Sequence, residues 1–89
     1  MNMDIPDPRL ARIFTTAACP ELPLPVVRNA HRLMRLLTAA ASWSDIGVFT
    51  KVALLKDGRF AAPVHGRWAI SFEWDDELDR IVNPSLERF

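Results

Sequence analysis

The chain has 89 residues, of which 49% are hydrophobic and 25% charged, and its formal net charge is zero. This length supports one domain, and the composition is too apolar for a disordered protein. A single cysteine excludes an internal disulfide, and no apolar run approaches the roughly 18 residues of a membrane-spanning helix. No leader opens the chain, so we expect one cytoplasmic domain over residues 1–89.

The zero net charge hides an uneven distribution along the chain. Residues 8–67 hold nine basic and three acidic residues, a net charge of +6, whereas residues 73–89 hold two basic and six acidic residues, a net charge of −4. A basic first part favours an anionic partner, although charges that only solvate helix faces and turns explain most such patterns in small domains.

Two helices are predicted in the first half of the chain. Asp7 can cap a helix that has Pro8 at its first position and continues to about Ala17. A proline-rich connector follows over residues 19–25. A longer helix is predicted from Pro25 to Ala41, because its apolar residues fall on one stripe at helical spacing.

The second half predicts an antiparallel sheet. From Trp68 to Trp74 large apolar side chains alternate with small or polar ones, which is the pattern of a strand, and Gly66 suits the tight turn before it. The predicted fold class is therefore α+β, with two N-terminal helices packed on a small, mainly antiparallel sheet. In chain order we expect a short edge strand over 1–5, a turn with apolar side chains beneath it over 43–49, a strand over 51–56, hairpin strands over 59–65 and 67–74, and a last strand from 80 that is interrupted near Pro84.

The familiar enzyme motifs are missing from the sequence. It has no glycine-rich phosphate loop, no metal-spaced cysteines and no His-Glu-x-x-His, so no metal site is predicted. His31 on the long helix is expected to be solvated. His65 lies at the hairpin turn between Arg59 and Arg67, which makes it the better candidate for moving a proton, although a turn histidine is more often only a polar turn residue.

Three segments together resemble the HigB branch of the RelE/ParE toxin superfamily, also called plasmid-maintenance killer proteins. They are the helical segment 27–42, the tripeptide Leu54-Leu55-Lys56 and the segment from Val64 to Trp74, whose Trp-x-Ile-x-Phe-x-aromatic strand is the strongest part. The resemblance spans most of the chain from about Pro8. It implies a bacterial toxin of a type II toxin–antitoxin pair, with two helices packed on a twisted antiparallel sheet.

The activity implied by this resemblance is cleavage of translated messenger RNA in the ribosomal decoding site, without a metal or other cofactor. A ribose 2′-hydroxyl would attack the adjacent phosphate, which requires a base, an acid and cations that stabilise the developing charge. The implied partners are the ribosome, its mRNA and a helix-turn-helix antitoxin of the HigA kind, which shields the toxin in a hetero-oligomer and binds operator DNA.

The chain departs from the family at positions that carry chemistry. Ala69 stands where an arginine normally follows the strand tryptophan, and Leu86-Glu87-Arg88-Phe89 replaces the usual Asp/Glu-Asp-Tyr-His ending. A weaker positive field than is usual for such toxins implies weaker RNA binding. The remaining catalytic candidates are His65, Arg67, Lys56 and Arg59, and the candidates for RNA binding are Arg59, Arg67, Arg88 and Lys51.

Two alternatives to a nuclease toxin stay open at this point. Ala69 and Phe89 favour a protein that keeps the toxin fold without nuclease chemistry, binds an antitoxin-like partner and contributes to operator repression. A gyrase inhibitor of the ParE kind shares the fold and needs no RNA-cleaving residues. DNA-damage signalling on expression, instead of translation arrest, would distinguish this second alternative.

Overall fold

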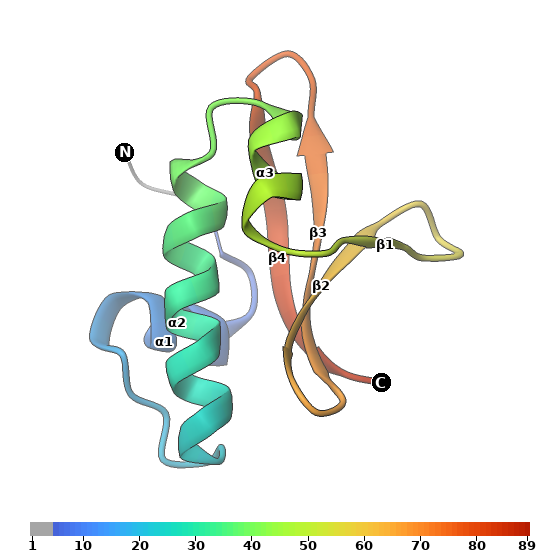
Figure 1. The fold of residues 1–89 in the computed structure, drawn as a ribbon. Coiled ribbons are helices and arrows are strands. Elements are labelled where there is room, and N and C mark those ends of the chain that lie inside the picture. The colour runs from blue at the N-terminus through green and yellow to red at the C-terminus, as the bar shows by residue number, and fades with distance from the viewer. Residues whose placement is uncertain (1–4) are drawn as a thin grey trace.

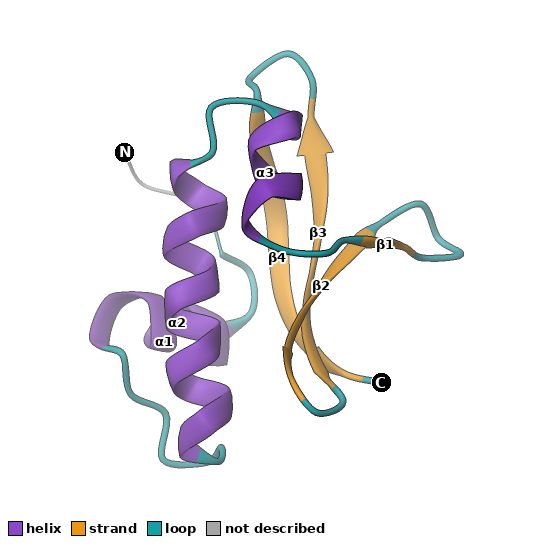
Figure 2. Cartoon of the chain, viewed as in Figure 1, coloured by secondary structure: helices purple, strands orange, loops and turns teal. Residues whose placement is uncertain are grey.

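The computed structural model describes residues 5–89, apart from the side chain of Phe49; the edge strand expected over residues 1–5 lies almost wholly outside this part. The described strands form one antiparallel sheet in the order β1-β2-β3-β4 (Figures 1 and 2). The α+β class predicted from the sequence is confirmed. The elements are α1 (Pro8–Thr16), α2 (Leu24–Ala39), α3 (Trp43–Phe49), β1 (Ala53–Leu54), β2 (Phe60–His65), β3 (Trp68–Asp75) and β4 (Arg80–Arg88).

Asp7 caps α1, as predicted, and also ties this helix to the last strand. Its Oδ1 accepts the backbone N–H groups of Arg9 at 2.9 Å and Leu10 at 3.4 Å. Its Oδ2 accepts the backbone N–H of Leu86 in β4 at 2.9 Å. Pro8 follows as the first helical residue, where a missing N–H costs nothing.

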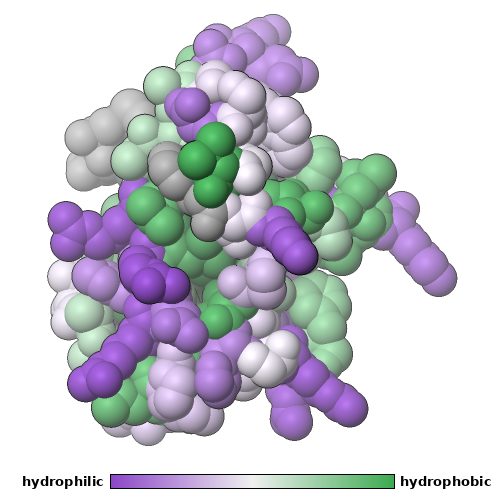
Figure 3. Space-filling model, in the orientation of Figure 1, coloured by the Kyte–Doolittle hydropathy of each residue, from purple (hydrophilic) through white to green (hydrophobic). Residues whose placement is uncertain are grey.

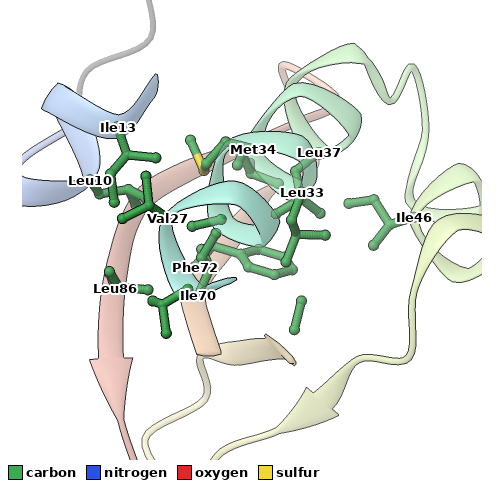
Figure 4. Packing of buried hydrophobic residues seen from close by; sticks show 14 of the residues in the cluster. Leu10, Ile13, Val27, Leu33, Met34, Leu37, Ile46, Ile70, Phe72 and Leu86 are labelled. Carbon is green, nitrogen blue, oxygen red and sulfur yellow. The ribbon is translucent and has the colours of Figure 1, made fainter. Parts of the chain in front are cut away.

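The long helix α2 covers one face of the sheet, and the core lies between them (Figures 1 and 4). Its apolar stripe is buried as the sequence predicts, and α1 closes one end of the core with Leu10 and Ile13. Fully burying a side chain of this size contributes roughly 1.5–3 kcal/mol to folding. The sheet and helix α2 contribute Ala62, Ile70, Phe72, Ile81 and Leu86 from the strands and Val26, Val27, Ala30, Leu33, Met34 and Leu37 from the helix.

Residues 43–49 form a helix, α3, where the sequence analysis expects a turn. Asp45 lies in its first turn, where a carboxylate suits the helix dipole, and Ile46 is fully buried. The ring centroid of Trp43 lies 4.5 Å from that of Phe60 in β2. The expectation of apolar residues beneath this segment is confirmed for Ile46. These tertiary contacts stabilise the helix, which the sequence does not predict because the segment is short and contains Gly47.

Two strands differ in length from their predictions. The first is only Ala53–Leu54, shorter than the expected 51–56. The last is one continuous strand through Pro84 to Arg88, and the interruption expected near Pro84 is present only as an irregularity in its pairing with β3. The register between β3 and β4 shifts beside Pro84, and Asn83 adopts φ 51°, as at a β-bulge. Among the described strands β4 is an edge, paired only with β3, and edge strands and bulges are the places where a sheet tolerates proline.

The sheet has a second face, opposite α2, which we call the open face. In β3 the core residues Ile70 and Phe72 alternate with Ala69 and Ser71, which lie on the open face. The predicted alternation is confirmed, yet Ala69 is only 8% exposed and Ser71 is fully buried. Other side chains of the open face therefore cover the middle of β3.

Candidate functional site

A groove of about 400 Å³ lies on the open face, near the β2–β3 turn. Ala61, Pro63 and Ala69 belong to neighbouring positions of β2 and β3 and give this groove an apolar floor. Methyl groups at Ala61 and Ala69 leave room above the strands that larger side chains would fill. Lys51, Arg67 and Phe89 contribute the charged and aromatic part of the lining.

Arg67 is held at the groove by the hairpin turn and by the end of β4. Gly66 before it has φ 57°, the left-handed conformation that the sequence predicts for this turn. The carbonyl of Arg67 accepts the backbone N–H of Phe89 at 2.8 Å, so the two lining residues are fixed to each other. Lys51 lies in the segment between α3 and β1.

The charge of the groove lining has one sign. Lys51 and Arg67 are exposed, neither side chain forms an ion pair with any residue from 5 to 89, and none of the residues that line the groove is acidic. Phe89 is 54% exposed beside them. Two free cations, an aromatic ring and an apolar floor suit an anion that also carries a flat, apolar group.

Glu87 is the carboxylate that the register places beside this groove. It pairs with Ala69 across β3 and β4, and directly paired residues share a face of the sheet, so its exposed side chain emerges on the open face. In the sequence Glu87 stands out only as part of the departure from the family ending. Glu87 and Phe89 are two residues apart at the end of β4, and this spacing places both side chains on one face of the sheet.

Arg59 also lies on the open face, away from the groove, and its guanidinium is engaged by three other residues. Its guanidinium donates to Glu73 at 3.1 Å, to the carbonyl of Asn83 at 2.6 Å and to Ser71 Oγ at 3.4 Å. These contacts cover Ser71 and join β2, β3 and the bulge of β4. In this arrangement Arg59 acts as a clamp between strands, and it does not line the groove.

The three other predicted site residues also lie outside the groove lining. Lys56 is exposed in the turn between β1 and β2, and His65 is exposed at the end of β2, where the register shifts. Arg88 neighbours Glu87 along β4, so its side chain points to the opposite face. The structure thus brings together Lys51 and Arg67 and separates Lys56, Arg59, His65 and Arg88 from them.

Trp68 lies on the core face of β3, in alternation with Ala69, and its ring is held by a contact from α1. The guanidinium of Arg9 lies 5.6 Å from the centroid of the Trp68 ring and donates to the carbonyl of Leu86 at 3.3 Å. Such a cation–π contact contributes about 0.5–1 kcal/mol where it is exposed. The tryptophan of the strand motif therefore has a packing role against α1 and the core.

Comparison with known proteins adds no relative: the chain matches no protein-family model and no curated protein sequence. Within residues 5–89 no three His, Cys, Asp or Glu side chains gather where they could hold a metal ion. None of the helices described is both long and apolar enough to cross a bilayer.

Proposed function

We propose that the protein is a toxin of a type II toxin–antitoxin system, a metal-independent endoribonuclease that cleaves mRNA on the ribosome. The groove on the open face carries this proposal, because it combines two unpaired cations with an apolar floor and an exposed aromatic ring. Single-stranded RNA offers phosphates to the cations and a base that can stack on Phe89. The helices packed on one face of an antiparallel sheet support a RelE/ParE-like arrangement.

The proposed reaction needs a proton acceptor, charge stabilisation and a proton donor. Glu87 takes the proton of the 2′-hydroxyl, whose oxygen attacks the adjacent phosphorus, and Arg67 and Lys51 stabilise the developing negative charge. The bond from phosphorus to the 5′-oxygen breaks, leaving a 2′,3′-cyclic phosphate and a 5′-hydroxyl. His65 lies outside the groove lining, so in this scheme solvent water protonates the leaving oxygen.

Expression in a bacterial host tests the proposal. Growth arrest together with new translation-dependent cuts in a reporter transcript, mapped by primer extension, is the expected result. Arg67→Gln should remove most of the cutting, since losing one group that stabilises transition-state charge typically costs 10²–10³ in rate. Arg12→Gln is the matched control, because Arg12 is an exposed cation of α1 that pairs with Glu21.

A protein that binds RNA or an antitoxin without cleavage is the second candidate. The observation that favours it is Ala69, an apolar floor residue where the resemblance implies an arginine. Retained binding of single-stranded RNA with an intact reporter transcript would support this function and contradict the nuclease. DNA-damage signalling on expression, with neither RNA binding nor transcript cleavage, would point instead to the gyrase inhibitor.

An antitoxin of the helix-turn-helix kind belongs to both versions of the proposal. Co-expression with the gene that neighbours this one tests it directly. Relief of growth arrest, and recovery of a complex by size-exclusion chromatography, would support a toxin–antitoxin pair. Growth arrest that persists beside a soluble product of the neighbouring gene would contradict that pairing.

A further inference from the structure

Three arginines form a stripe on the side of α2 that faces away from the sheet. Arg28, Arg32 and Arg35 follow the spacing i, i+4, i+7, which places them on one face of a helix over about 10 Å. All three are exposed, and α2 contains no acidic residue. Hydrophilic side chains project from the surface over α2, with hydrophobic patches visible between them (Figure 3). We call these residues the arginine stripe.

The arginine stripe has no partner within residues 5–89. None of its side chains forms a hydrogen bond or an ion pair there, whereas Arg12 reaches Glu21 and Arg59 reaches Glu73. Like charges at i, i+4 on a helix repel each other, as Arg28 and Arg32 do here. The stripe therefore weakens α2, and no contact in the described structure compensates for it.

We propose that the arginine stripe binds the phosphate backbone of double-stranded RNA. Arginine donates in a planar fork that matches phosphate oxygens, and the buried face of α2 keeps the three side chains on a rigid support. No aromatic residue lies in α2, so this surface lacks the aromatic rings on which unpaired bases commonly stack. Duplex RNA, which proteins recognise mostly by shape and backbone, fits such a surface best.

An acidic protein partner fits the arginine stripe less well. Protein interfaces have an apolar or aromatic centre, whereas interfaces with nucleic acid are polar and strongly positive. Among the large hydrophobic side chains that the described structure exposes, α2 contributes only Leu24, its first residue. The centre of the stripe thus lacks the apolar patch that a protein would cover.

The stripe and the groove lie on opposite sides of the molecule, because α2 covers the sheet face that the groove does not use. The inference goes beyond the proposed function, since it assigns a second RNA-binding surface of another kind. Its test measures duplex binding without ribosomes or cleavage. If the groove does not cleave RNA, the result of this test is unaffected.

The experiment follows binding of a fluorescent, blunt RNA duplex by anisotropy over a range of salt concentrations. R28Q/R32Q/R35Q should lower the slope of log K against log[salt] by about 2–3, at roughly 0.7–0.9 for each phosphate that the variant no longer neutralises. R28K/R32K/R35K keeps the charges and should keep the slope. Circular dichroism checks that both variants fold, which is expected because glutamine and lysine are good helix formers at exposed positions.

Two outcomes would overturn the inference. An unchanged slope in R28Q/R32Q/R35Q, measured on folded protein, would show that the stripe does not touch phosphate. Displacement of the duplex by a glutamate-rich peptide at equal concentration of negative charge would instead indicate an acidic protein partner. Arg12→Gln, an arginine outside the stripe that is already paired with Glu21, should leave the slope unchanged.

Discussion

Replacing Asp7 by alanine should destabilise the protein far more than losing a helix cap. Removing a cap of this kind costs about 1 kcal/mol. The same change also removes the acceptor for the N–H of Leu86, a residue that is 2% exposed, and an unsatisfied buried donor costs about 1–3 kcal/mol. The total is about 2–4 kcal/mol, a large share of a stability of roughly 5–15 kcal/mol.

Urea unfolding and a thermal melt measure this effect. For a domain of this size each kcal/mol shifts Tm by about 4–8 °C, so a loss of about 2–4 kcal/mol should lower the Tm of Asp7→Ala by at least about 8 °C. Asp7→Asn keeps one acceptor oxygen and should lose about half as much. Asp57→Ala removes a carboxylate that accepts one exposed N–H, from Arg59, and should cost less than about 1 kcal/mol. A loss of only about 1 kcal/mol in Asp7→Ala would refute the bridge to β4.

Three further predictions concern the open face and α3. Arg59→Met should lower the free energy of unfolding by about 1–2 kcal/mol, because Ser71 and Asn83 lose a charged donor; urea unfolding that shows no change would rule out the clamp. Ala69→Leu should fill the groove and weaken binding of single-stranded RNA at least tenfold with little effect on Tm, and unchanged anisotropy titrations would contradict binding there. Trp43→Ala should cost about 2 kcal/mol, less than a fully buried tryptophan, since Trp43 is 39% exposed; a thermal melt equal to wild type would show that α3 needs no aromatic anchor.

Local signals in the sequence are enough to predict the helices and the hairpin. Asp7 and Pro8 mark the start of α1, the apolar stripe marks α2, and Gly66 marks the turn between β2 and β3. Each depends on backbone conformation or on spacing within one element. These properties are determined by neighbouring residues, so they can be predicted before the fold is known.

Contacts between distant segments account for what the sequence does not predict. Helix α3 depends on Ile46 and on the packing of Trp43 against Phe60, and the path of β4 through Pro84 depends on an edge position in the sheet. Arg59 looks like a free cation until the fold brings Glu73 and Asn83 to it.

The groove is the part of the candidate site that is hardest to predict. It consists of space above Ala61 and Ala69, and small residues do not indicate by themselves which larger side chains surround them. Lys51 and Arg67 can be assigned to one groove only when the fold is known, because the hairpin turn and the end of β4 come together only in the folded chain.

The contacts of Asp7 and Arg9 with Leu86 also bear on how this protein meets other chains. Leu86 directs its N–H and its carbonyl away from β3, and both are taken by those two side chains, while Pro84 offers no N–H at all. A strand of another chain therefore cannot extend the hydrogen bonding of the sheet along this stretch of β4. Here the fold resists edge-to-edge aggregation, and a partner that recognises this side must do so through side chains instead of β-augmentation.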